Sequence, residues 1–236
     1  MFVFKRRNIL IISVLIITAI TFVVCLGALK ENPVGSDTFN PVKIVLDAGH
    51  GGVDGGVSGI KTKVKESELN LKIVKKLEQY LTSAGFTVVL TRSSDAGLYG
   101  LATSGLKKKD MLKRKQIIEE TNPNLVVSIH LNQYSLPSRR GAQVFYREDS
   151  EYSKILANSI QKSFNQMEDA TRECSILTGD YYILNCTDYP SVIAECGFLS
   201  NPEDEALLIT EKYQNELSYA IFKGIVEYLT VQSNKI

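Results

Sequence analysis

The stretch from Ile44 to Gly52 reads Ile-Val-Leu-Asp-Ala-Gly-His-Gly-Gly and joins a short apolar run to a glycine turn. Short apolar runs rich in β-branched residues are typical of buried strands, and glycine permits the positive φ angles of tight turns. His50 therefore stands at the carboxyl end of a predicted strand, where open α/β sheets bind ligands. Such a histidine is either a metal ligand or acid/base group, or a plain loop residue, and the stretch alone leaves both open.

The length of the chain is enough for one well-packed α/β domain and a short additional segment. The chain has 236 residues, a net charge of +1 and a pI near 7.6, which gives no electrostatic case for a nucleic-acid partner. Of the 4 cysteines, one lies in the apolar N-terminus, so an odd number remains and a disulfide framework is not expected. A single bridge between Cys174 and Cys186 stays open, and Cys196 is expected to be buried.

The N-terminus has the pattern of an export signal. Basic residues at 5–7 precede an apolar run over 9–29. This run is closer to the about 20 residues of a membrane span than to the about 7–15 of a signal-peptide core. We favour an uncleaved membrane anchor with the rest of the chain exported, and a cleaved signal peptide is the alternative. We expect residues 1–29 to form this segment, 30–41 a linker and 42–236 the folded domain.

Apolar patterns predict an alternation of strands and helices. Continuous apolar runs of strand length occur at 44–48, 86–91, 125–129, 142–146, 181–184 and 191–195. Helical spacing predicts one helix that begins near Glu66 and ends before Gly85, and others over 107–121, 151–167 and 213–229. Strand–helix–strand order implies right-handed parallel crossovers. The predicted fold is α/β: a mostly parallel twisted sheet of about six strands with helices on both faces, preceded by an N-terminal hydrophobic helix.

Four chemical groups meet at one edge if this sheet is mostly parallel: His50, Glu66, His130 and Glu195. The chain has only 2 histidines, and each follows a predicted strand directly. Catalytic zinc commonly takes three protein ligands from His and Glu and keeps one position for water. His50, Glu66 and His130 fit that count. A carboxylate outside the metal shell must then move the proton of the water, and Glu195 is the candidate.

Each of these residues also has a structural explanation. Glu66 could stabilise the positive end of a helix dipole. His130 could be a hydrogen-bonded core histidine, and Glu195 could form an ion pair with Arg92 or Arg114. The spacing alone leaves these explanations open.

Five motifs resemble those of the zinc-dependent N-acetylmuramoyl-L-alanine amidases of the amidase-3 family. They are Leu-Asp-Ala-Gly-His-Gly-Gly at 46–52, Glu66 with Asn70-Leu71, Leu-Thr-Arg at 90–92, Ser-Ile-His-Leu-Asn at 128–132 and Glu-Cys-Gly-Phe-Leu-Ser-Asn at 195–201. The resemblance runs from about Val42 to Leu229. It implies that His50, Glu66 and His130 are the zinc ligands and that Glu195 is the catalytic glutamate.

The sequence departs from the family pattern at three positions near these motifs. Ala48, Leu131 and Cys196 stand where proline, alanine and leucine are usual. None of the three is an implied ligand, although Leu131 could narrow the pocket beside His130.

The resemblance implies hydrolysis of the amide between the lactyl group of N-acetylmuramic acid and L-alanine in peptidoglycan. An anchor followed by one catalytic domain resembles the germination-type amidases of spore formers, which implies a role in spore cortex maturation, where muramic lactam forms. The implied partners are the peptidoglycan substrate and the membrane, and an accessory or activating exported protein stays open. Another zinc peptidase or deacetylase of the cell wall, or a non-catalytic wall-binding protein with an amidase fold, is the alternative.

Overall fold

The computed structural model describes residues 41–170 and 173–233. The predicted anchor or signal segment 1–29, with its hydrophobic helix, lies outside these residues, as does nearly all of the predicted linker. Both therefore stay predictions. None of the described helices is long and apolar enough to cross a membrane.

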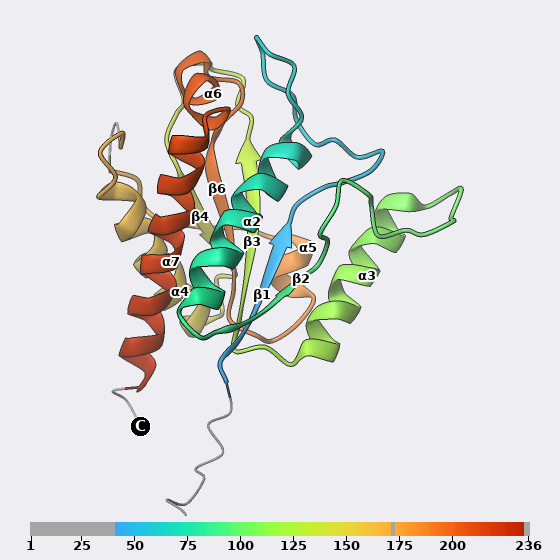
Figure 1. Cartoon of the computed structure of the whole chain (residues 1–236), viewed down its shortest axis with the longest axis vertical. Helices are drawn as coiled ribbons and strands as arrows, with labels where there is room; N and C mark the ends of the chain where they lie inside the picture. Colours follow the sequence, from blue (N-terminus) through green and yellow to red (C-terminus); the bar gives the residue numbers. More distant parts are fainter. Residues whose placement is uncertain (1–40, 171–172, 234–236) are drawn as a thin grey trace, which may run out of the picture. The chain divides into compact units, whose positions relative to one another are not determined.

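In the described part of the chain, strands form one mixed sheet. Their order is β2 (Thr87–Leu90), β1 (Lys43–Ala48), β3 (Leu125–Asn132), β6 (Ser191–Phe198), β4 (Gln143–Tyr146) and β5 (Leu177–Thr178). The first four run parallel, whereas β4 pairs antiparallel with β6 and parallel with β5. This confirms the predicted six-stranded, mostly parallel sheet. Because β1, β3 and β6 are parallel neighbours, their carboxyl ends lie at one edge of the sheet (Figure 1).

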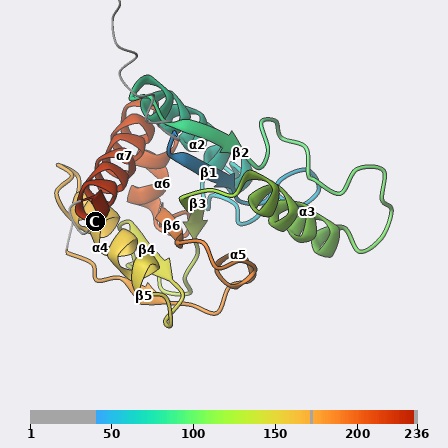
Figure 2. The same cartoon turned by 90° about the horizontal axis from the view of Figure 1, so that it is seen from below.

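Helices cover both faces of this sheet, as predicted (Figure 2). One face carries α2 (Glu66–Ser83), α4 (Glu151–Asn165) and α7 (Glu211–Ser233), and the other carries α3 (Leu106–Thr121) and α5 (Tyr182–Asn185). Successive strand residues point to opposite faces. In β1, Ile44 and Leu46 accordingly join the larger core, while Val45 joins a smaller core with Ile118 of α3.

Helix α2 matters most for the site because it begins at the sheet edge where the carboxyl ends of β1, β3 and β6 lie. Leu69, Ile73, Leu77 and Leu81 recur every four residues and are fully or almost fully buried against the sheet. The helix ends at Ser83, and Gly85 takes a φ of 88° just beyond it. The buried stripe fixes the rotation of α2, so the side chains of its first turn face the ends of β1 and β3.

The structure corrects the prediction for residues 181–184. The sequence predicts a strand here, but Tyr182–Asn185 forms the short helix α5. The strand that completes the sheet beside β4 is β5, which comes earlier in the chain. A four-residue apolar run cannot be assigned by periodicity alone. Ile183 and Leu184 are buried in the smaller core, which a single helical turn achieves as well as a strand does.

Two further differences concern the end of the domain and the cysteines. The helix α6 (Pro202–Leu208) was not predicted; the Asn201 side chain caps it by accepting from the N–H groups of Glu203 and Asp204. Cys174 and Cys186 are both free thiols, so the bridge left open does not form. Cys196 is fully buried, as expected.

Candidate metal centre

His50 lies on the turn that ends β1. The Gly49 N–H donates to the Ile129 carbonyl oxygen over 3.0 Å, so pairing with β3 continues up to the histidine. His50, Gly51 and Gly52 then take φ angles of 61°, 137° and 63°. A left-handed backbone costs a non-glycine residue about 1–2 kcal/mol, and such strain collects at functional sites.

Strand register brings His130 and Glu195 to the same edge. Ala48 of β1 is the register partner of Ile129 in β3, so His130 follows beside the His50 turn. His130 is in turn the register partner of Glu195 in β6. The centroids of the two histidine rings lie 5.0 Å apart.

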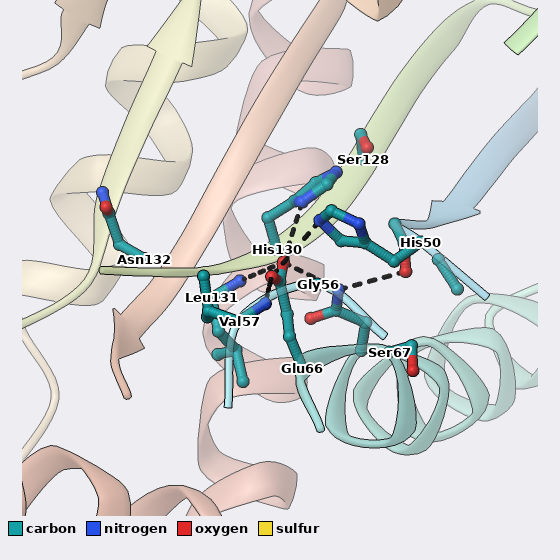
Figure 3. Close-up of polar contacts among 12 residues, drawn as sticks. His50, Gly56, Val57, Glu66, Ser67, Ser128, His130, Leu131 and Asn132 are labelled. Atoms are coloured by element: carbon teal, nitrogen blue, oxygen red, sulfur yellow. Dashed lines mark hydrogen bonds and ion pairs between the residues drawn. The ribbon is translucent and has the colours of Figure 1, made fainter. Parts of the chain in front are cut away.

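Glu66 joins the two histidines from the first turn of α2. Its Oε2 lies 3.2 Å from Nε2 of His50, and its Oε1 lies 2.9 Å from Nδ1 of His130 (Figure 3). Donor atoms of the three residues all lie within 4.8 Å of one another. In the described part of the chain, they form the one group of three or more such side chains that could hold a metal ion.

The Glu66 carboxylate is held by more than the histidines. Its side chain is only 2% exposed. The N–H groups of Val57 and Leu131 donate to it over 3.0 and 3.1 Å, and the Asn70 amide donates over 3.2 Å. These donors fix the orientation of the Glu66 carboxylate.

The electrostatics of the three groups fit a cation between them. Burial alone would raise the pKa of Glu66, but hydrogen bonds from both histidines lower it below its usual range. Burial would lower the pKa of His50, yet the hydrogen bond and charge of Glu66 raise it to about 9. The pKa of His130 is raised by Glu66 against burial in the same way. Two imidazoles and one carboxylate are the donor set of many catalytic zinc sites, so the residues present fit zinc.

Asp54 completes the surroundings of His50. Its Oδ1 lies 3.0 Å from Nδ1 of His50, which leaves Nε2 facing Glu66. A carboxylate on the second ring nitrogen is the usual way in which a metal-binding histidine is oriented. Sequence reasoning missed Asp54, although a carboxylate four residues after the histidine in the glycine-rich loop was the available signal.

Glu195 lies beside the three-residue cluster without belonging to it. Its Oε2 atom is buried and has no hydrogen-bond partner among the described residues. Burial raises the pKa of Glu195 to about 7, although the positive charge of His130 opposes the shift. Neither arginine considered as its partner pairs with it, because Arg92 donates to backbone carbonyls and Arg114 to Asp47 and Asp110.

A pocket of about 590 Å³ opens over the cluster. His50, His130 and Glu195 line this pocket. Residues of α3 and of the α5 segment form its walls: Leu106, Lys107, Met111, Tyr181, Tyr182 and Ile183. The tyrosines of this wall were not among the predicted site residues, because the apolar run over 181–184 predicts a strand.

Comparison with known proteins assigns this arrangement to a family. The family described as N-acetylmuramoyl-L-alanine amidase matches residues 44–227. The chain belongs to this amidase family. The resemblance inferred from the motifs is therefore confirmed, and the protein is an N-acetylmuramoyl-L-alanine amidase of peptidoglycan.

Three relatives illustrate the similarity. The germination-specific N-acetylmuramoyl-L-alanine amidase of Bacillus subtilis is 33% identical over 89% of this chain and 92% of its own. The CwlD amidase of Clostridioides difficile, solved in complex with the GerS lipoprotein, is 39% identical with a TM-score of 0.78, over 80% of this chain and 99% of that one. The catalytic domain of CwlV from Bacillus (Paenibacillus) polymyxa var. colistinus is 34% identical with a TM-score of 0.71, over 80% and 99%.

Two glycines leave the space in which His50, Glu66 and His130 approach one another. A Cβ atom on Gly49 would lie 2.2 Å from Cε1 of His130, and one on Gly56 would lie 2.3 Å from Oε2 of Glu66. Gly56 also has a φ of 67°, which a side chain would strain. The glycines around His50 thus serve the close approach of these side chains as well as the turn.

We predict that Gly49→Ala lowers hydrolysis of purified peptidoglycan by about 10²-fold, because the added methyl group displaces the His130 ring by about an ångström. Gly55→Ala is the matched control: the new methyl group would approach the aliphatic chain of Lys65, at 3.0 Å from its Cδ, and that chain can move. The control should keep parental activity. Parental activity in Gly49→Ala would show that the ring position is not critical.

Proposed function

We propose that this amidase uses zinc held by His50, Glu66 and His130 to cleave the bond between the lactyl carbonyl of N-acetylmuramic acid and L-alanine. The observation that carries the proposal is the convergence of these donor atoms within 4.8 Å beside a buried carboxylate oxygen of Glu195 that has no hydrogen-bond partner among residues 41–170 and 173–233. When bound, zinc activates a water molecule at neutral pH and polarises the substrate carbonyl.

The chain's own residues perform the remaining tasks. Glu195 accepts a proton from the attacking water molecule while the oxygen of that water bonds to the carbonyl carbon of the lactyl group. Glu195 then gives that proton to the alanine nitrogen as the C–N bond breaks, leaving a lactyl carboxylate and a free amino group. A carboxyl group with a pKa near 7 suits both halves of this transfer, because it is present in both protonation states near neutral pH.

The pocket supplies the space for the substrate. Its volume of about 590 Å³ extends beyond the cluster toward α3 and the α5 segment. The aromatic rings of Tyr181 and Tyr182 offer amphipathic surfaces of the kind that contact sugars and peptides. Lys107 places a positive charge at the same wall, where the carboxylates of a stem peptide would be attracted.

The proposed biological role is maturation of the spore cortex. The similarity to the germination-specific amidase of Bacillus subtilis and to the CwlD amidase supports this role. Removing the stem peptide frees the lactyl carboxyl group, which is the group that closes onto the sugar in muramic lactam. The alternatives of a cell-wall peptidase or deacetylase would leave that carboxyl group blocked.

The proposed location is outside the cytoplasm. Basic residues followed by the apolar run 9–29 support export, with an uncleaved anchor favoured over a cleaved signal. An accessory exported protein is part of the proposal, because the similar CwlD amidase was solved in complex with a lipoprotein. Peptidoglycan is the substrate at this location.

The test of this function is product analysis on cortex peptidoglycan from spores that lack the gene. That cortex should retain its stem peptides and contain no muramic lactam. The purified amidase should release peptides that begin with L-alanine, lose this activity in a chelator and regain it with added zinc. Released peptides with other N-termini, released acetate, or undiminished activity after metal removal would contradict the proposal.

We predict that Glu195→Gln keeps the parental zinc content while turnover falls by about 10²–10⁴-fold, because the amide cannot accept the proton. His130→Ala is the matched comparison and should lose zinc together with activity.

In the parent, kcat/KM should fall as the pH drops through a value at or below 7. Glu195 becomes protonated in this range, and the nearby metal charge lowers the pKa of Glu195.

Zinc content measured on the purified variants and a pH–rate profile of the parent check these expectations. Loss of zinc in Glu195→Gln would make Glu195 a ligand instead of the proton carrier. Unchanged turnover in that variant would transfer the proton step to another group.

A further inference from the structure

Two buried arginines donate hydrogen bonds to the backbone carbonyl oxygens of the His50 turn. Arg114 donates to the carbonyl oxygens of Ala48 and His50 over 2.8 and 2.6 Å. Arg92 donates to the carbonyl oxygens of Ala48 and Gly49 over 2.8 and 3.0 Å. Three successive carbonyls of one turn therefore all accept from guanidinium groups.

Arg114 is neutralised by its own partners rather than by the catalytic carboxylates. It is 1% exposed and donates to Asp47 and, over 2.6 Å, to Asp110. Asp47 is held in turn by the hydroxyl groups of Thr91 and Ser128, the first at 2.7 Å. The guanidinium is thus fixed in one orientation before it meets the turn.

Arg92 links the two elements that carry Glu66 and His50. It is 3% exposed, and besides the turn it donates to the carbonyl oxygen of Ser67, the residue after Glu66, over 2.8 Å. Within the described residues, it forms no ion pair with a carboxylate, so carbonyl oxygens are its principal partners.

A contribution to stability alone does not explain two buried arginines at this turn. Burying a guanidinium removes it from water, and well-packed apolar side chains commonly replace buried ion pairs without loss of stability. At the left-handed His50 turn these carbonyl oxygens accept from side chains: from the two guanidinium groups and, at Gly49, also from the Asn70 amide over 3.2 Å. A planar group with five fixed donors can satisfy two carbonyls at once, which a lysine ammonium cannot do with the same geometry.

We propose that Arg114 and Arg92 are positioning residues for the metal site. They hold the His50 turn in its left-handed conformation and at a set distance from the start of α2, so that His50 and Glu66 are placed for the metal before it binds. This inference rests on the proposed function, in which those two residues are metal ligands.

The test is metal binding by Arg114→Lys, which keeps the positive charge but cannot reach both carbonyls. We expect its dissociation constant for zinc, measured by chelator competition, to rise about 10–100-fold, as it does when groups that orient metal ligands are changed. The visible absorption spectrum of the cobalt(II)-substituted protein should change as well, because the ligand geometry is altered. Arg92→Lys should show the same two effects.

Arg140→Lys is the matched control. Arg140 also pairs with carboxylates, Glu203 and Asp204, but it does not line the pocket over the cluster. The control should lose thermal stability without any change in zinc affinity or cobalt spectrum. The proposal would be overturned if all three variants lost zinc affinity in proportion to their loss of melting temperature. The arginines would then have only a structural role.

Two further outcomes separate this inference from the proposed function. A parental protein that binds no zinc would defeat the proposed function itself. A parent that binds zinc and an Arg114→Lys variant with the same affinity and spectrum would defeat the inference alone. If the lysine variants do not fold, Asp110→Asn takes their place, because it loosens Arg114 while keeping an acceptor for the Leu98 N–H. A weaker zinc affinity in Asp110→Asn supports the proposal, and an unchanged one overturns it.

Discussion

A carboxylate buried between two imidazoles is the constraint on which the rest of this structure depends. The Glu66 side chain is 2% exposed, and a buried charge is tolerated only when it is paired and fully hydrogen-bonded. His50, His130 and the N–H groups of Val57 and Leu131 meet that requirement here. The glycines at 49 and 56 leave room for this pairing, since a methyl group at either position would overlap a cluster side chain.

The parallel sheet explains how residues so far apart in the chain can meet. β1, β3 and β6 are neighbours in register, so His50 just after β1, His130 in β3 and Glu195 in β6 lie next to one another. Helix α2 adds Glu66 because its buried stripe sets which side of its first turn faces that edge. Glu195 shares the pocket but remains outside the donor cluster, which is the separation that the proposed division of roles requires, with one carboxylate for the metal and another for proton transfer.

The parts of this arrangement predictable from sequence were those with a strong local signal. Long apolar runs identified β1 and β3, and a histidine after each run identified the functional edge. The α5 segment was misread because a single buried turn and a short strand bury the same residues. Its tyrosines were missed as pocket walls for that reason. Asp54 and the arginine contacts could not be predicted, because they depend on loop geometry and on which carbonyls a turn leaves unpaired.

The most direct test of the account is an anomalous diffraction measurement at the zinc absorption edge on crystals of the zinc-loaded protein. We predict one peak between the His50 turn and the first turn of α2, about 2.0–2.2 Å from donor atoms of His50, Glu66 and His130. The Glu195 carboxylate should lie in the same pocket without touching the metal. A peak bonded to Glu195 in place of Glu66, or no peak at this position, would contradict the account.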